Sequence, residues 1–184
     1  LQRVLNSYWL MIHVAVIVAS YGPFALGMIL GFVSLVLIFF TNEKNKAKMD
    51  LNIQELTYIN EMALTIGLVM LTIGNFLGGQ WANESWGRYW GWDPKETWAL
   101  IVLLGYVAVL HGRLVGMVKD FGMAAAAVIA FNLVIMAWYG VNFVLGAGLH
   151  SYGFGAGGVE YVASFCAVNL LLVIFVSMKR QRRS

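Results

Sequence analysis

Residues 9–40 of this 184-residue chain are WLMIHVAVIVASYGPFALGMILGFVSLVLIFF, a run with no Asp, Glu, Lys or Arg. About 20 consecutive apolar residues are enough for a helix to cross a bilayer, so this run predicts a membrane-spanning helix. Gly22 and Pro23 lie inside it, and proline interrupts the hydrogen bonding of a helix. We therefore expect either a kink at residues 20–23 or a helix that extends beyond the bilayer.

Four further apolar stretches follow, at residues 56–78, 97–118, 121–145 and 159–178. The chain is 60% hydrophobic and only 11% charged, with a mean hydropathy of +0.75, which leaves too little polar surface to cover a soluble domain. The prediction is an all-α fold: a polytopic transmembrane helix bundle with five spans that forms a single membrane domain over residues 1–184. Glycines four residues apart, which let membrane helices approach closely, occur at Gly27/Gly31, Gly74/Gly78 and Gly112/Gly116.

The lysines and arginines divide unequally between the two sides of the predicted membrane. One side carries Lys44, Lys46, Lys48, Arg113, Lys119, Lys179, Arg180, Arg182 and Arg183, and the other carries Arg3, Arg88 and Lys95. Because positively charged loops stay in the cytoplasm, we expect the first side to be cytoplasmic and the second to face the periplasm or an equivalent space. The basic balance follows from topology, so it predicts no nucleic-acid partner.

Two residues inside the spans need an explanation of their own. Glu61 lies about one turn inside the second span, where a carboxylate is costly without a partner. We expect it to form a hydrogen bond between helices or to reach towards the interface, in preference to a proton-relay role. Cys166 is the only cysteine, so it leaves no CxxC redox pair, and we expect it to be a small core residue.

Residues 81–98 are WANESWGRYWGWDPKETW and hold five of the seven tryptophans: Trp81, Trp86, Trp90, Trp92 and Trp98. Indole rings offer broad faces for stacking and an N–H donor. The segment therefore predicts a flat aromatic platform, a short external helix or loop, for a large planar ligand such as haem. Trp86 and Trp90 are four residues apart and would share a helical face. Arg88 and Lys95 are the basic side chains suited to haem propionates.

The sequence DPKE at residues 93–96 has the pattern of a helix start. Asp93 is a typical N-cap, Pro94 suits the first helical position, and Glu96 is placed to reach back to the cap. The acidic residues therefore need no catalytic role. For Asp93, two interpretations remain open: capping the helix, or orienting a group that faces the ligand.

The chain has three histidines, His13, His111 and His150. His13, near the outer end of the first span, and His150, in a glycine-rich connection over residues 146–158, fall on the same side as the Trp-rich segment. Two neutral imidazoles are a common axial pair for haem iron. His111 lies in the third span, where an ionisable group is a functional hypothesis by default. It would ligate a second haem within the membrane, or form a hydrogen bond to a neighbouring helix.

Four segments together resemble a known family. WGRYWGWDPKETWAL resembles the WWD motif of the haem-handling protein superfamily, in the version typical of the CcsA/ResC family of cytochrome c biogenesis, found also as the CcsBA fusion. WLMIHV, YVAVLHGR and GLHSYGFG are similar to the same family and occur in the same order. The four segments extend over most of the chain, which makes the resemblance specific.

This resemblance implies a membrane haem transporter and holocytochrome c synthase, an enzyme that attaches haem to the CxxCH thiols of apocytochrome c. It implies that His13 and His150 ligate haem b at an external site, that residues 81–98 form the platform, and that His111 holds haem within the membrane. No catalytic residues are expected beyond those that position haem. The expected location is the bacterial inner membrane, with the platform and the external site facing the periplasm.

The resemblance also implies partners. The family uses four histidines, so the missing one is expected from a CcsB/ResB-type subunit or fused region, and a thiol-reducing system is expected to keep the apocytochrome reduced. Complete members have more spans, so the chain is expected to be the carboxy-terminal core of a larger synthase. Two alternatives are a haem-delivery protein that loads a chaperone without forming thioethers and a b-type membrane electron carrier. A small-solute transporter would leave the histidines unexplained.

Overall fold

The computed structural model describes residues 7–150 and 157–182. Within these ranges it contains helices and no strands, in the order α2 (Tyr8–Phe40), α3 (Lys46–Trp86), α4 (Pro94–Leu114), α5 (Asp120–Ile135), the π-helix η1 (Met136–Leu145) and α6 (Val159–Gln181). Helix η1 continues α5, and the resulting five helical segments are each long and apolar enough to cross a membrane. The predicted all-α polytopic bundle is therefore confirmed, and the chain is a multi-pass membrane protein.

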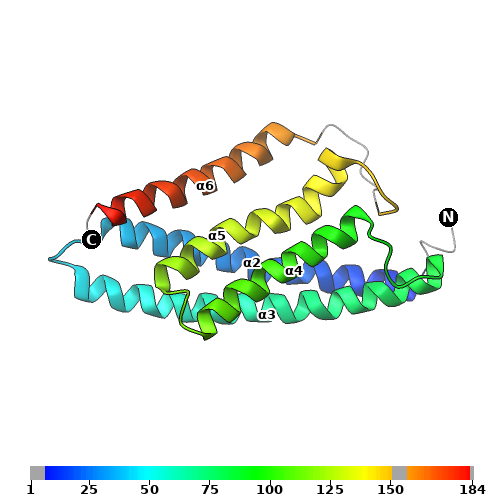
Figure 1. Cartoon of the computed structure of the whole chain (residues 1–184), viewed down its shortest axis with the longest axis horizontal. Coiled ribbons are helices and arrows are strands. Elements are labelled where there is room, and N and C mark those ends of the chain that lie inside the picture. Colours follow the sequence, from blue (N-terminus) through cyan, green and yellow to red (C-terminus); the bar gives the residue numbers. More distant parts are fainter. Residues whose placement is uncertain (1–6, 151–156, 183–184) are drawn as a thin grey trace.

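The helices lie roughly along one axis, as Figure 1 shows. Helix α2 packs along α3 and α5, α4 lies against α3 and α5, and α6 covers α5 and part of α2. Helix α2 begins at one end of the bundle and α6 finishes at the other (Figure 1). The two ends of the bundle can therefore differ in charge and in role.

Helices α3 and α4 differ at both ends from the predicted second and third spans. Helix α3 has 41 residues, because the polar residues after 45 and the first two tryptophans of the Trp-rich segment continue the helix. Helix α4 begins at Pro94 and ends at Leu114, so it lies three to four residues earlier in the chain than the predicted span 97–118. Helix α2 runs without a break through Pro23 for 33 residues. At 1.5 Å per residue it is about 50 Å long, longer than a hydrocarbon core of about 30 Å.

Two of the three glycine pairs make close contacts between helices. A Cβ at Gly31 would lie 2.7 Å from the carbonyl oxygen of Ala124 in α5, and one at Gly74 would lie 2.5 Å from the side chain of Ile17 in α2. The prediction of helix packing is wrong for the third pair, Gly112/Gly116. Gly116 has φ +77°, in the left-handed region, and belongs to the turn after α4. That pair shapes a turn.

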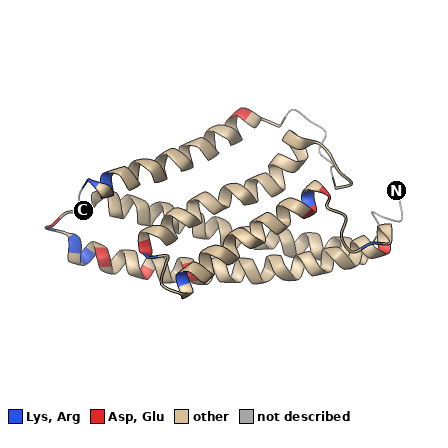
Figure 2. Ribbon diagram, in the orientation of Figure 1, with Lys and Arg blue, Asp and Glu red and all other residues tan. Residues whose placement is uncertain are grey.

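Charged residues mark the two ends of the bundle, as Figure 2 shows. Basic residues gather where α2 joins α3, where α4 joins α5 and where α6 finishes. Fewer lie at the opposite end, where α3 joins α4, the segment that holds Arg88 and Lys95. Arg3 and Arg183 lie outside the described residues. The division of charge predicted from the sequence is thus present in space for the residues that the structure describes.

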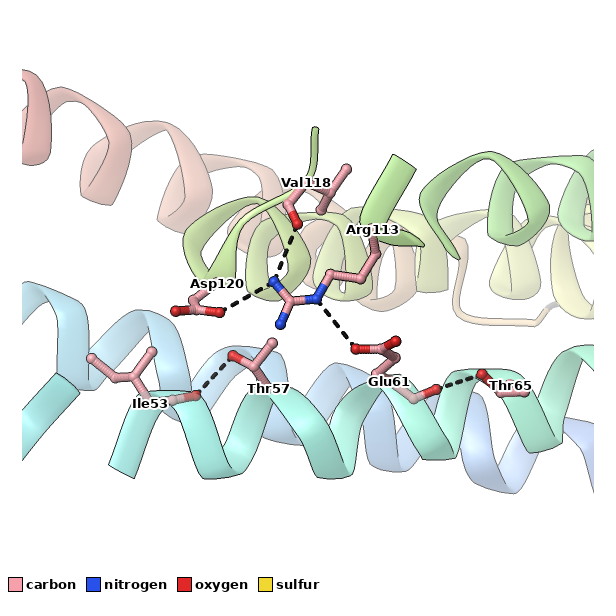
Figure 3. Close-up of polar contacts among 7 residues, drawn as sticks. All are labelled: Ile53, Thr57, Glu61, Thr65, Arg113, Val118 and Asp120. Carbon is pink, nitrogen blue, oxygen red and sulfur yellow. Dashed lines mark hydrogen bonds and ion pairs between the residues drawn. The ribbon is translucent and has the colours of Figure 1, made fainter. Parts of the chain in front are cut away.

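At the basic end, Arg113 links three helices, as Figure 3 shows. Its Nε donates to Glu61 Oε2 of α3 at 3.2 Å, and one terminal nitrogen donates both to the carbonyl of Val118 at 3.2 Å and to Asp120 Oδ1 of α5 at 3.3 Å. The predicted hydrogen bond between helices at Glu61 is therefore confirmed. Cys166 is half-buried on α6 and has a free thiol.

Candidate functional site

A cavity of about 290 Å³ lies at the end of the bundle opposite Arg113. The start of α2, the carboxy-terminal part of α3, the start of α4, helix η1 and the residue His150 all contribute to its walls. Its polar and aromatic lining includes His13, His150, Trp81, Trp90, Lys95 and Asn142. Two of the three histidines, distant in sequence, therefore reach one cavity.

His13 is buried on the second turn of α2, with 5% of its surface exposed. Its Nδ1 lies 2.7 Å from the carbonyl oxygen of Trp9. Because a carbonyl only accepts, this contact assigns the ring proton to Nδ1 and leaves a lone pair on Nε2. A Cβ at Gly78 would lie 3.3 Å from the His13 ring, so the glycine leaves the space that the imidazole occupies.

His150 is held by contacts with the start of α4. Its Nδ1 lies 3.1 Å from Asp93 Oδ1, so the carboxylate faces this ring nitrogen. The other oxygen, Asp93 Oδ2, accepts a 2.5 Å hydrogen bond from the N–H of Leu149. Gly148 has φ +97°, and a Cβ there would overlap the Asp93 carboxylate. The connection therefore needs glycine at this position to approach the cap of α4.

The surroundings of His150 favour its neutral form. Burial lowers the pKa of His150 below its ordinary value, and the contact with Asp93 raises it only in part. A neutral imidazole is the form that binds a metal ion. With Nδ1 facing a carboxylate, the proton is expected on Nδ1, so Nε2 carries the lone pair here as well.

Asp93 and Glu96 form the capping box that the sequence predicts. Asp93 Oδ1 accepts from the N–H of Lys95 at 3.0 Å, and Glu96 Oε2 accepts from the N–H of Asp93 at 3.1 Å and of Gly91 at 2.7 Å. The two interpretations of Asp93 turn out to be compatible. One carboxylate caps α4 and also contacts a histidine of the cavity.

Trp81 is fully buried and contacts both histidines of the cavity. Its ring centroid lies 5.1 Å from that of His13 with an interplanar angle of 25°, and 5.4 Å from that of His150 with an angle of 58°. Trp86, one turn and a half further along, packs edge-on against Trp81 at 4.7 Å and His150 at 4.9 Å. These two tryptophans therefore support the histidines.

The tryptophans of residues 81–98 do not lie on the one flat surface that the sequence predicted. Trp90 and Trp92 are nearly perpendicular, at 88°, and Trp92 is 70% exposed, with φ 58°. Helix α3 finishes at Trp86 with Gly87 in the left-handed region, φ +71°, so Trp86 and Trp90 share no helical face. Trp98 lies on α4 and packs against the core that Phe24 and Tyr106 occupy, away from the cavity lining.

The two basic residues of the segment lie in different places. Lys95 lines the cavity, and its amine donates to Asn142 Oδ1 at 3.3 Å. Arg88 lies with its guanidinium carbon 5.8 Å from the centroid of the Trp86 ring. It also covers Gly91, where any Cβ would overlap the guanidinium. Because the guanidinium is the end of a flexible side chain, this contact alone does not require glycine at position 91.

His111 is separate from the cavity. It is exposed in the last turn of α4, and its Nδ1 lies 2.8 Å from the carbonyl of Val107 in the same helix. Asp93 caps the other end of α4, so Asp93 and His111 lie roughly 27 Å apart along the helix axis at 1.5 Å per residue. The alternative of a hydrogen bond to a neighbouring helix is wrong. The imidazole bonds to its own helix, which leaves Nε2 facing outward from the bundle.

Four polar residues of the cavity were not predicted. Tyr21, Asn75 and Asn142 line it from α2, α3 and η1, and Tyr89 lines it from the segment between α3 and α4. A polar residue within an apolar span is itself a sign of function, and this criterion would have found Asn75 and Asn142. Helix η1 is a π-helix, which has wider turns than an α-helix. Such turns often occur at functional sites, but no sequence pattern predicted this one.

The chain matches the family model described as cytochrome C assembly protein over residues 1–150. It is 50% identical over 156 residues to protein NrfI of Wolinella succinogenes, which covers 84% of this chain and 17% of that protein. It is 42% identical over 151 residues to cytochrome c biogenesis protein CcsA of Chlamydomonas reinhardtii, covering 82% of this chain and 42% of the relative. For CcsA of Guillardia theta the identity is 40% over 167 residues, covering 81% and 55%.

The chain therefore spans between about a sixth and just over half of the length of these relatives. The family model covers all three histidines and the whole Trp-rich segment. Haem handling is implied by this family. On this match and on these relatives, the chain belongs to the CcsA/ResC family of cytochrome c biogenesis proteins.

Proposed function

We propose that the chain binds haem b with His13 and His150 as the two axial ligands and presents it to apocytochrome c for covalent attachment. In this role it is the haem-binding core of a holocytochrome c synthase. One observation carries the proposal: both imidazoles line one cavity. Each has an oxygen beside Nδ1, so Nε2 is available to iron.

The residues of the cavity fit a haem group. Iron in a low-spin haem accepts two neutral imidazole nitrogens, one on each face of the ring. The oxygens of Trp9 and Asp93 fix the required tautomers of His13 and His150, as the second shell of a metal site commonly does. The cavity of about 290 Å³ is at the lower end of small-molecule sites, roughly 300–1,000 Å³. A porphyrin would therefore project beyond its rim, where a second protein can reach it.

Lys95 is the best candidate to bind a haem propionate. Its amine lies in the cavity lining, and its hydrogen-bond partner Asn142 is neutral. The negative charge acting on it is that of Asp93, which is engaged in the cap of α4, so the amine can also attract a propionate. Arg88, whose guanidinium lies over the Trp86 ring, is the second candidate. A cation near each haem propionate would fix the rotation of the porphyrin about the axis between the two histidines.

The contribution of the chain to the reaction is positioning. Bound haem supplies two vinyl groups, to each of which one thiol of a CxxCH segment adds to form a thioether. His13 and His150 would hold the ring still, and Trp81 and Trp86 would exclude water from the imidazoles. Holding two reactants in place makes their encounter effectively intramolecular, which lowers the barrier substantially. The carboxylates of Asp93 and Glu96 are engaged in the helix cap and need no acid–base role.

We propose that the protein lies in the bacterial inner membrane with the cavity facing the periplasm. The support is the distribution of charge, since the basic residues gather at the end opposite the cavity and such residues remain in the cytoplasm. This orientation would expose the cavity on the side where c-type apocytochromes receive haem. A thiol-reducing system on that side would keep the CxxCH cysteines available.

We propose a separate role for His111, as one ligand of a haem within the membrane. It is exposed on α4 with Nδ1 bonded to Val107, so Nε2 faces outward and can meet a ligand from another helix. Neither of the other two histidines of this chain lies near it. The opposite ligand would then come from a CcsB/ResB-type subunit or fused region, which would pack against this face of α4.

The experiment is a haemin titration of the purified protein, followed by the visible spectrum of the reduced form. The variants are His13→Ala, His150→Ala and the control His111→Ala, which lies outside the cavity. We expect a low-spin b-type spectrum that weakens in the first two variants and persists in the third. A spectrum that is unchanged in both cavity variants would refute the pairing of His13 and His150.

A second measurement separates synthase from haem delivery and from electron transfer. The haem-loaded protein is mixed with a reduced apocytochrome peptide containing CxxCH, and the haem is then extracted with acidified acetone. Haem that stays on the peptide supports the synthase. Haem that moves to the peptide and remains extractable supports delivery, and haem that never leaves the protein supports an electron carrier.

A further inference from the structure

We infer that Trp81 is a positioning residue that sets the rotation of both imidazoles and holds their planes inclined to each other. This inference rests on the proposed function, because it concerns His13 and His150 as ligands of haem. Trp81 contacts both rings: it stacks on His13 and packs obliquely on His150. A single buried indole thus acts on both candidate ligands.

The angles around Trp81 limit how the two imidazoles can be arranged. The plane of His13 makes 25° with the indole plane, and that of His150 makes 58° with it. Two planes that make these angles with a common third plane must be inclined to each other by at least 33°. The two imidazoles are therefore not parallel, whatever the direction of each tilt.

The position of Trp81 is itself fixed. The side chain is fully buried, and Trp86 packs against it at 4.7 Å. His13 is held at two points, by the indole face and by its bond to the Trp9 carbonyl. Its ring therefore has no free rotation about the bond to Cβ. His150 is held by Trp81, Trp86 and Asp93 in the same way.

The inclination has a measurable consequence for a bound ferric iron. The π orbitals of two parallel imidazoles overlap with the same iron d orbital. This overlap separates that orbital in energy from the second d orbital, which lies perpendicular to it. Inclined imidazoles divide their overlap between the two orbitals, which then lie closer in energy, and the largest g value of the low-spin ferric ion increases. Second-shell groups that orient a ligand tune a metal site in this manner.

Electron paramagnetic resonance of the ferric, haem-loaded full-length protein tests the inference. The variants are Trp81→Leu and Trp81→Met, which fill space without a flat ring face. The control is Trp98→Leu, which removes a partly buried tryptophan of the same segment that packs away from the cavity. We expect the native protein to show a low-spin signal with a large highest g value. Both Trp81 variants should shift that value downward and broaden the line, and the control should match the native protein.

The outcomes separate this inference from the function on which it rests. A native low-spin signal that disappears in His13→Ala and His150→Ala, yet keeps its g value and width in the Trp81 variants, overturns the inference alone. The absence of a low-spin signal in the native protein overturns both. Thermal unfolding of each variant checks the fold. If Trp81→Leu fails to fold, Trp81→Met decides, because its flexible side chain fits irregular space.

Discussion

Asp93 connects the start of α4 with His150: one carboxylate oxygen lies 3.1 Å from His150 Nδ1, and the other accepts the N–H of Leu149. The same carboxylate caps the helix through the N–H of Lys95. The position of the candidate ligand is therefore coupled to the folding of α4. A carboxylate behind a histidine also makes the imidazole a stronger metal ligand.

Replacing Asp93 by Asn tests this coupling. Asn is as good an N-cap as Asp, so α4 should still form, but an amide has no charge and a single acceptor oxygen. The carboxylate partly offsets the lowering of the His150 pKa by burial, so its removal lets the pKa fall further and weakens the imidazole as a ligand. We expect haem affinity to fall about 10- to 100-fold, measured by haemin titration, with an unchanged far-ultraviolet circular dichroism spectrum. Native affinity in Asp93→Asn would contradict the coupling.

Replacing Glu96 by Gln is the matched test of the other acidic residue. Gln also closes a capping box, so its amide oxygen can still accept from the N–H groups of Asp93 and Gly91. We expect haem affinity and melting temperature to stay close to the native values, although Glu96 lines the cavity. Complete loss of haem binding in a folded protein would show that the carboxylate charge acts on the ligand itself.

The sequence predicted the spans because membrane helices are encoded locally, by the length of each apolar run. It also predicted that His13 and His150 would share one side, since His13 lies near the outer end of the first span and His150 lies in the connection after the fourth span, at the same end. The fully buried packing of Trp81 against both rings was not predicted, because it depends on how α2 and α3 meet. Contacts between Asp93 and the connection before α6 likewise depend on the folded arrangement.

The tryptophans show why a local pattern was misleading at the site. Their density predicted one surface, but Gly87 ends α3 between Trp86 and Trp90 and turns the chain. The capping box then starts α4, which carries Trp98 back into the core. Composition therefore identified the segment, and the breaks between helices decided which indole rings face the cavity.

Replacing Gly148 by Ala should damage the site without unfolding the bundle. Its φ of +97° is strained for any L residue, at a cost of about 1–2 kcal/mol, and the new Cβ would overlap the Asp93 carboxylate. His150 would move away from Asp93, and haem affinity should fall at least as far as in Asp93→Asn. The control is Gly116→Ala, with φ +77° and open space around it. It carries similar strain at the other end of α4 and should leave haem binding unchanged, so equal losses in both variants would contradict this account.

Replacing Arg113 by Ala should destabilise the bundle and leave the cavity unchanged. The guanidinium links α3, α4 and α5 through Glu61, Val118 and Asp120. The two carboxylates are each about a third exposed, so solvent screens them, and we expect a loss of about 1–2 kcal/mol. The melting temperature should fall while haemin titration gives native affinity. A haem defect without a change in melting temperature would mean that Arg113 acts on the ligand.

Replacing His111 by Ala distinguishes the two proposed haem sites. Because His111 is exposed on α4, roughly 27 Å along the helix axis from the cap at Asp93, its loss should not alter haemin binding to the purified protein. In cells, where haem would have to pass through the membrane, the same variant should accumulate little haem and mature little cytochrome c. Haemin added from the periplasmic side should restore maturation in His111→Ala and fail to restore it in His13→Ala. Restoration of maturation in both variants would show that His13 is needed for haem transport and is not needed at the external site.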